Sequence, residues 1–289
     1  MQLLESSVME RLRCALERFG EVFENTAEFS LDNHVVSVQT CFGPEQTGKS
    51  INQDAGLAIH CRNGSPIKWA CAIADGVGTS PFSEVGSRAA TWAALVGLCE
   101  STQRQRPKSQ ALDAVCRAHE TIRILARSLE ADLTKLRFKP KYLPAPAYRH
   151  AVERRSCFQT TLCIVWCDGY SIYIASVGDS GALLATKNEP CKCLFFPDVS
   201  SSYVNPISAG LESIGLDYWV QTPVGGVTVA VFTDGVAKSL AEQHGSQLAN
   251  FGLHSFIQKR TASELLAVLS DSTSEEAADN MSLLVVRAS

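Results

Sequence analysis

The chain alternates short apolar runs with polar turns, and this pattern predicts a protein rich in β-strands. Short apolar or alternating segments are typical of strands, particularly where Gly, Asn or Asp pairs separate them. Asn63-Gly64 and Asp168-Gly169 each separate two such segments and therefore predict hairpin turns. We expect strands over residues 35–42, 56–61, 67–74, 160–166, 170–177, 227–233 and 281–287.

Helices are predicted where apolar residues recur every three or four positions. The longest such stripe runs from Leu112 to Leu136, and a second helix is expected from residues 81–84 to Glu100, with Ser83 as its N-terminal cap. Shorter helical patterns cover residues 1–28, 246–258 and 262–271. Two segments rich in Pro, Ser or basic residues are expected to be irregular, and these are residues 137–156 and 187–226.

The order of these elements is strands, two helices, strands, two helices and a final strand. Because hairpins connect most of the strands, their pairing should be mostly antiparallel. Two sheets with helices on their outer faces would bury the apolar side of every element. We therefore predict an α+β protein, a four-layer αββα sandwich of two mostly antiparallel sheets flanked by helices. Residues 1–34 should form an N-terminal helical extension, and residues 35–289 a single domain.

The composition is that of a globular protein and excludes several functional classes. The 289 residues are 45% hydrophobic and 19% charged, and the formal net charge of −4 gives no reason to expect a nucleic-acid partner. No apolar run is long enough for a membrane span, and the first residues lack the apolar core of a secretory signal. We therefore expect a cytoplasmic protein that does not associate with a membrane.

The eleven cysteines agree with a reducing compartment. Most of them lie inside apolar segments, as Cys71, Cys99 and Cys163 do, which is typical of buried reduced thiols. Cys191 and Cys193 form a C-x-C pair, but no second pair with zinc-type spacing follows it. A structural zinc site at this pair is therefore the weaker interpretation.

Carboxylates recur where the predicted strands begin or end. Asp75 and Asp234 each follow an apolar strand and precede a glycine, Asp54 and Asp279 come just before strands, and Asp179 follows one. Each aspartate alone is typical of a turn or a helix cap. If the strand ends converge, however, the carboxylates would repel one another unless hard cations such as Mg²⁺ or Mn²⁺ lay between them. Asp168-Gly169 lies between two strands and is expected to be only a turn.

Seven motifs lie around these carboxylates, and their order along the chain is informative. They are NQDA at 52–55, IADGVG at 73–78, GSRAA at 86–90, FQTTL at 158–162, SVGDSGALL at 176–184, FTDG at 232–235 and DNMSLLVV at 279–286. Together they resemble the metal-dependent serine/threonine protein phosphatases of the type 2C family, particularly its compact bacterial-type branch. The resemblance covers residues 35–286.

The resemblance implies direct hydrolysis of phosphoserine and phosphothreonine in proteins by a metal-activated water, without a phosphoenzyme intermediate. Two Mn²⁺ or Mg²⁺ ions are implied, with Asp75 bridging them; Asp75 and Asp234 are catalytic through metal-bound water. Gly76, through its carbonyl, and Asp54 are implied to hold one ion, and Asp234 and Asp279 the other. Asp179 matches the position that supports a third ion. Thr161 and Asn280 match motif positions that support the site or the fold.

Two positions depart from the family pattern. Many relatives carry an arginine that grips the substrate phosphate where this chain has Lys49, which supplies charge but no bidentate fork. Arg62, Lys68, Arg88 and the basic residues at 149–155 are other candidates for that role. Some relatives carry a histidine as general acid where this chain has Val77.

Three functions fit these residues. An active phosphatase, opposing a cognate serine/threonine kinase on a phosphoprotein substrate, is favoured by the full set of aspartates. A pseudophosphatase or regulatory phosphoprotein-binding module is the alternative that Lys49 keeps open. A phosphatase of non-protein phosphoesters has no support from a Walker loop or a GxGxxG motif. No cysteine lies in a CxxxxxR-type phosphate loop, which argues against a thiol phosphatase.

The N-terminal helix is expected to pack on the sandwich, with docking of a partner as the alternative.

Overall fold

In the part of the chain that the structure describes, the strands form two sheets of six strands each. The computed structural model describes residues 2–31, 34–41, 52–101, 105–133, 145–186, 189, 191–198, 204–244, 257, 260–272 and 279–288. In spatial order, the first sheet contains β1 (Gly20–Glu24), β4 (Ala55–Cys61), β5 (Trp69–Ala74), β6 (Leu162–Cys167), β7 (Ser171–Val177) and β10 (Tyr218–Pro223). The second contains β2 (Thr26–Leu31), β3 (His34–Cys41), β12 (Met281–Ala288), β11 (Val227–Phe232), β8 (Gly181–Thr186) and β9 (Lys192–Phe195).

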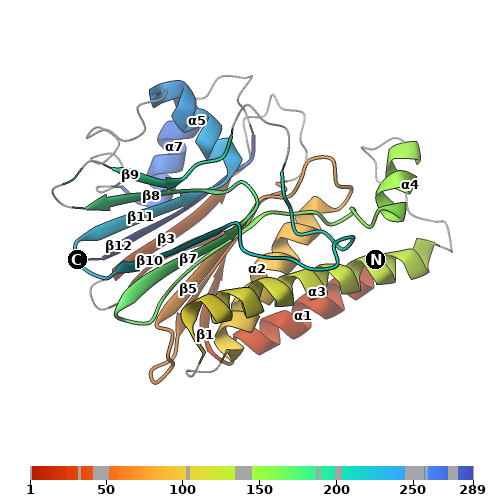
Figure 1. Cartoon of the computed structure of the whole chain (residues 1–289), viewed down its shortest axis with the longest axis horizontal. Coiled ribbons are helices and arrows are strands. Elements are labelled where there is room, and N and C mark those ends of the chain that lie inside the picture. The colour runs from red at the N-terminus through yellow and green to blue at the C-terminus, as the bar shows by residue number, and fades with distance from the viewer. Residues whose placement is uncertain are drawn as a thin grey trace.

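Helices cover the outer face of each sheet, so the molecule has four layers (Figure 1). On the first sheet, α2 (Ser83–Glu100) contacts β4, β5 and β6, and α1 (Gln2–Leu16) and α3 (Pro107–Leu133) pack against α2. On the second sheet, α5 (Asp234–His244) and α7 (Ala262–Ser272) contact β12. Every named strand pair is antiparallel. The predicted α+β sandwich with αββα layers is therefore confirmed.

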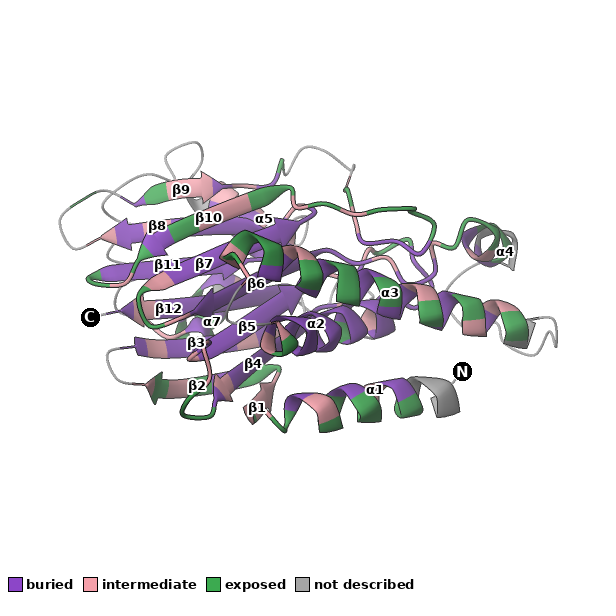
Figure 2. Ribbon diagram, turned by 60° about the horizontal axis from the view of Figure 1, so that its bottom comes forward, coloured by how far each residue is buried: buried purple, intermediate pink, exposed green. Residues whose placement is uncertain are grey.

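The central strands are buried on both faces because each sheet lies between another sheet and a helical layer (Figure 2). In β5, Trp69, Cys71 and Ile73 point between the sheets, whereas the small residues Ala70 and Ala72 face the helices. Alanine on this face lets the equally alanine-rich helix α2 approach the sheet closely. This packing fixes the ends of the strands relative to α2.

The prediction of a helix over residues 1–28 is wrong beyond the first helix. Residues 20–24 and 26–31 are strands, and β1 pairs with β4 while β2 pairs with β3. The sequence GEVFENTAEFSL alternates apolar and polar residues, and the open edges of the two sheets supply the pairing partners that favour strands. The helix itself packs as expected, because Val8, Leu12 and Leu16 join the core. A domain boundary at residue 34 stays a prediction.

Other local differences have equally local causes. A fourth helix, α4 (Ala145–Glu153), lies within the segment expected to be irregular; its proline, Pro146, is in the first turn, where proline is tolerated. Ser83 is not the cap of α2 but its first helical residue, and its Oγ accepts a hydrogen bond from Gln53 Nε2 at 2.7 Å.

The remaining differences concern two edge strands, two further elements and one expected helix. The strands β9 and β10 lie within residues 187–226, which were expected to be irregular, and both are edge strands that only their neighbours define. The strand β8 and the helix α5 were not predicted. Most of the helix expected at 246–258 lies outside the described residues. Within the described part of the chain, no helix has both the length and the apolar character that crossing a bilayer requires.

Candidate metal centre

Both sheets contribute carboxylates to one edge of the sandwich. Because β4 and β5 are antiparallel, with Ala55 opposite Ala74, Asp54 before β4 lies beside Asp75 after β5. In the second sheet, β11 and β12 are antiparallel, so Asp234 after β11 and Asp279 before β12 share an edge in the same way. A hydrogen bond from Thr233 Oγ1 to Asp54 Oδ2, at 3.0 Å, joins the two edges across the sandwich. The convergence predicted for these strand ends is therefore present.

The carboxylates perturb one another strongly. Burial raises the pKa of Asp54 to about 7, with a further contribution from the negative charge of Asp234; a hydrogen bond with Asp75 opposes the shift. Burial also raises the pKa of Asp75 well above its usual range, and the charges of Asp54 and Asp234 add to this. Asp179 belongs to the same group, because burial and then the charge of Asp234 raise its pKa to about 6. Gathered acids of this kind favour protons or cations between them.

The backbone of Asp75 is held by two adjacent threonines. Asp75 donates its amide hydrogen to Thr161 Oγ1 at 3.0 Å, and its carbonyl accepts from the Thr161 amide at 2.8 Å. Thr160 Oγ1 donates to the same carbonyl at 2.8 Å. Thr160 was not singled out from the sequence, although it is part of the FQTTL motif. Together the two threonines fix the direction in which the Asp75 side chain leaves the strand.

Gly76 is required because three groups crowd its α-carbon. A Cβ at this position would lie 2.7 Å from the carbonyl oxygen of Gln53 and 2.8 Å from both Cβ and the carbonyl oxygen of Ser83. The Gly76 amide donates to that Gln53 carbonyl at 3.1 Å, and Ser87 Oγ donates to it at 2.6 Å. The close approach ties the segment that carries Asp54 to the segment that carries Asp75 and to α2.

Thr233 positions Asp54 and was missed from the sequence. Its hydroxyl donates to Asp54 Oδ2 and accepts a hydrogen bond from the Ser282 amide at 3.0 Å. One side chain thereby links β11, β12 and the carboxylate of the other sheet. The only signal in the sequence was its place directly before Asp234 in FTDG.

Lys238 is the third residue that the sequence analysis missed, and it contacts two of the carboxylates. Its Nζ is 2.7 Å from Asp234 Oδ2 and 3.0 Å from Asp279 Oδ2. Burial disfavours its charged form, but the two aspartates outweigh burial and raise the pKa of Lys238. Its spacing of four residues from Asp234 was visible in the sequence. Its contact with Asp279, in contrast, is a consequence of the fold.

The oxygen atoms present suit a hard divalent cation. Asp54 Oδ1 and Asp234 Oδ1 are buried and have no hydrogen-bond partner. Mg²⁺ and Mn²⁺ prefer such carboxylate oxygens as ligands. Within the described residues, no three His, Cys, Asp or Glu side chains are arranged so that they could hold a metal ion as they stand.

The basic residues considered for phosphate binding are distributed unevenly. Lys49 lies outside the described residues. Arg62 follows β4 and Lys68 precedes β5, so both lie at the ends of these strands opposite Asp54 and Asp75. A six-residue strand is about 20 Å long, which removes both residues from the carboxylates.

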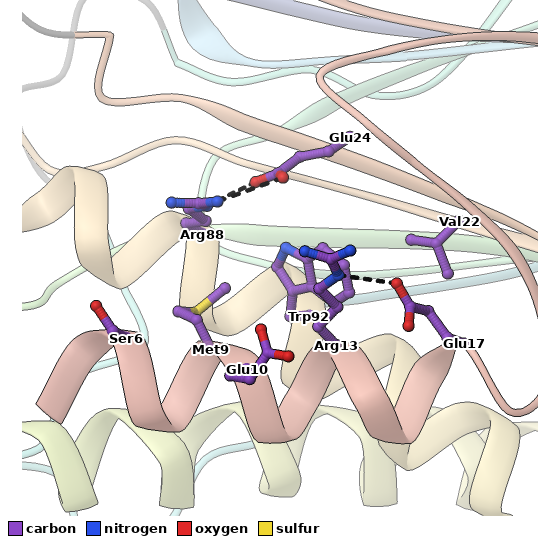
Figure 3. A pocket seen from close by; sticks show the side chains of 9 residues that line it. All are labelled: Ser6, Met9, Glu10, Arg13, Glu17, Val22, Glu24, Arg88 and Trp92. Carbon is purple, nitrogen blue, oxygen red and sulfur yellow. Dashed lines mark hydrogen bonds and ion pairs between the residues drawn. The ribbon is translucent and has the colours of Figure 1, made fainter. Parts of the chain in front are cut away.

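Arg88 is engaged elsewhere, in a hollow between α1, β1 and α2. Its Nε lies 2.6 Å from Glu24 Oε1, and Figure 3 shows the two side chains pointing toward each other. The hollow has a volume of about 410 Å³ and is lined on the α1 side by Met9, Glu10 and Arg13. It contains none of the converging carboxylates, so it is separate from the candidate metal centre.

The basic segment at 149–155 does approach the segment that follows Asp75. His150 and Arg154 line a hollow of about 780 Å³ together with Thr79 and Gln159. Gln159 is tied to the Asp75 segment, since its carbonyl accepts a hydrogen bond from the Val77 amide at 3.1 Å. The hollow thus reaches the segment after Asp75 through Thr79 and Gln159, while none of the converging carboxylates lines it.

Comparisons with known proteins identify the relatives of this fold. A sequence model of the family described as protein phosphatase 2C matches residues 45–270. The serine/threonine phosphatase PstP/Ppp of Mycobacterium tuberculosis has 14% sequence identity and a TM-score of 0.56, over 88% of this chain and 98% of that one. A search of curated protein sequences finds no match.

Two further solved structures share the architecture. A PstP catalytic domain in complex with two manganese ions has 15% identity and a TM-score of 0.58, over 88% of this chain and 97% of that one. The phosphatase Stp1 of Staphylococcus aureus has 12% identity and a TM-score of 0.58, over 88% of this chain and 94% of that one. At such identities the structural likeness concerns the fold.

Proposed function

Because the chain belongs to the protein phosphatase 2C family, we propose that it is a metal-dependent hydrolase of phosphoserine and phosphothreonine in proteins. The observation that carries the proposal is the meeting of Asp54, Asp75, Asp234 and Asp279 at one edge of the sandwich, from strands of both sheets. The buried, unpartnered oxygens of Asp54 and Asp234 support a cation there. The manganese-bound PstP domain supports the same choice of metal.

In this proposal, Asp54, Asp75 and the carbonyl of Gly76 would hold one Mn²⁺ or Mg²⁺ ion, and Asp75, Asp234 and Asp279 would hold another. Asp179 would support a third. When bound, such ions would supply Lewis acidity for the hydrolysis of the phosphoester. The chain itself contributes orientation, because Thr160 and Thr161 fix Asp75 and Thr233 fixes Asp54.

Direct hydrolysis without a phosphoenzyme is supported by the state of the Cys41 thiol, which senses the charge of Asp54. Burial, and then the negative charge of Asp54, raise the pKa of Cys41 to about 11. The thiol is therefore protonated at neutral pH and is a poor nucleophile. None of the eleven cysteines forms a disulfide, which supports the proposed location in the cytoplasm.

For the substrate, we propose a phosphorylated protein whose chain approaches through the hollow lined by His150 and Arg154. Two basic side chains there suit an acidic or phosphorylated segment. A cognate serine/threonine kinase would supply this substrate, because a monoester phosphatase requires a reaction that forms the ester. Phosphate binding by Lys49 stays a prediction.

A pseudophosphatase with the same fold is the second candidate, and Lys238 is the observation that favours it. An ammonium group on two of the carboxylates already neutralises part of their charge without a metal. Such a protein would bind phosphoproteins without turning them over.

Hydrolysis of a phosphothreonine peptide with Mn²⁺, with Mg²⁺ and with EDTA tests the proposal. We expect turnover with either metal and none with EDTA. Asp234→Asn should lower the rate by at least about 100-fold, the order expected when a group that stabilises charge in the transition state is removed, while circular dichroism remains that of the wild type. A folded wild-type protein that binds Mn²⁺ but shows no turnover would favour the pseudophosphatase.

A further inference from the structure

Lys238 contacts two of the carboxylates. It is one turn after Asp234 on α5, so the helix directs both side chains to the same side. Its ammonium contacts the Oδ2 atoms of Asp234, which follows β11, and Asp279, which precedes β12 at the same end of the strand pair. Helix geometry and strand pairing together place one positive charge between two carboxylates.

The carboxylate group is therefore divided into two unequal halves. Asp234 and Asp279 have Lys238 as a cationic partner, while Asp54 accepts a hydrogen bond from the neutral Thr233 hydroxyl and lies beside Asp75. The charge of Lys238 also reaches Asp179, whose ionised form it favours. The half around Asp54 and Asp75 has no such cation among its described contacts.

A divalent ion at Asp234 and Asp279 would bind the same two carboxylates as the ammonium, even where it took the unpartnered Asp234 Oδ1. Two cations on the same pair of carboxylates repel strongly, more so where burial reduces screening by water. The ammonium must therefore move when the ion binds. It is able to do so, because the Lys238 side chain is 31% exposed and its flexible stem can carry the charge into solvent.

We infer that Lys238 is a tethered cation that competes with the divalent ion at Asp234 and Asp279. The chain then binds one ion tightly at Asp54 and Asp75 and a second ion weakly, because only the second must displace the ammonium. This inference rests on the proposed function and adds to it a control of activity by metal concentration. At low metal concentration the site holds one ion and the lysine; at high concentration it holds two ions.

The test is Mn²⁺ binding to the full chain, measured by isothermal titration calorimetry and by the electron paramagnetic resonance of free Mn²⁺. For the wild type we expect one tight and one weaker ion. Lys238→Gln removes the charge and keeps a side chain of comparable reach. It should tighten the second ion by about tenfold or more, the order that removing a nearby like charge produces, and leave the first within about twofold. The Mn²⁺ concentration for half-maximal phosphatase activity should fall in parallel.

Two control variants separate this effect from a general change of charge. Lys108→Gln removes one positive charge from the exposed side of α3, away from the second sheet, and should leave both affinities unchanged. Lys238→Arg retains the charge and should keep the second ion weak.

Each other outcome has one meaning. An unchanged or weaker second ion in Lys238→Gln would overturn the inference. Two equally tight ions in the wild type would also overturn it, and this measurement needs no variant. Absence of Mn²⁺ binding in the wild type and in every folded variant would instead refute the metal centre and the proposed function with it.

Discussion

Two Asp-Gly pairs follow buried strands of the same sheet, and the molecule uses them differently. Asp168-Gly169, after β6, is a turn. Asp168 Oδ1 accepts hydrogen bonds from the amides of Tyr170 and Ser171, each at 2.8 Å, and Oδ2 accepts from the Tyr173 hydroxyl at 2.7 Å. Gly169 has a φ of +98°, which glycine adopts readily. Both oxygens of the carboxylate therefore accept hydrogen bonds from its own hairpin.

Asp75-Gly76, after β5, lies at the opposite edge because β5 and β6 are antiparallel. Here the neighbouring threonines bind the backbone of Asp75 and leave its carboxyl group to face Asp54 and Asp234. Gly76 is needed for close approach to Gln53 and not for a positive φ. The difference teaches that an Asp-Gly pair becomes a candidate ligand when local donors leave its carboxylate unsatisfied.

The largest expected effect comes from replacing Asp75 by asparagine, and the same replacement of Asp168 is the comparison. Asp75→Asn should lower phosphatase activity by about 100-fold or more, because it removes a charge at the centre of the proposed metal site. Asp168→Asn should retain activity within about twofold, because its contacts lie at the other edge of the sheet. Rates on a phosphothreonine peptide with Mn²⁺ measure both. Equal losses in the two folded variants would mean that the turn and the centre are not distinct.

The pH dependence of stability should further distinguish the aspartates of the candidate metal centre from the aspartate of the turn. The pKa of Asp54 is about 7 in the folded chain and 3.8 as its ordinary value, so between these values the folded state holds the extra proton. In the metal-free protein, the contribution of Asp54 to the free energy of unfolding should therefore be greatest below about pH 4 and should fall as the pH rises toward 7. At about 1.4 kcal/mol per pKa unit, this contribution falls by up to about 4 kcal/mol.

Urea unfolding in EDTA between pH 4 and pH 8 measures this slope. Asp54→Asn should flatten it, while Asp75 and Asp179, whose pKa values are raised in the same direction, keep a remainder. Asp168→Asn, which removes a carboxyl group from the other end of the sheet, serves as the matched control. A slope unaffected by Asp54→Asn would contradict the proposed burial of an acid at this position.

The smallest effects come from the two glycines. Gly76→Ala should cost about 2 kcal/mol of unfolding free energy, because its Cβ would overlap two backbone carbonyls. It should also lower activity by displacing Asp75. Gly169→Ala should cost about 1 kcal/mol, from backbone strain at positive φ alone, and spare activity. Unfolding midpoints and phosphatase rates of the two variants measure these effects. A loss of activity in Gly169→Ala would contradict the prediction.

Much of the fold follows from local pattern. Both-face burial makes β5 and β11 continuous apolar runs, and the hairpin pair Asp168-Gly169 announces its own turn, so these elements were predictable. Edge strands were not: β1, β2 and β9 carry mixed sequences that become strands only because a neighbouring strand offers hydrogen-bond partners. Likewise α4 lies in a segment, residues 137–156, that is rich in proline and basic residues, and burial of Tyr148 and Ala151 stabilises the helix.

The candidate centre was also predictable only in part. The sequence by itself identified the acids that are candidate ligands, because each lies beside a strand that its local pattern predicts; they are Asp54, Asp75, Asp179, Asp234 and Asp279. Only the tertiary structure decided that strand ends from two sheets meet, that Thr233 orients an aspartate of the opposite sheet, and that Lys238 reaches Asp279. Hydrogen bonds and Coulomb interactions act over a few ångströms in space. Their partners, separated here by up to 179 positions, are chosen by how the sheets pack and not by sequence neighbourhood.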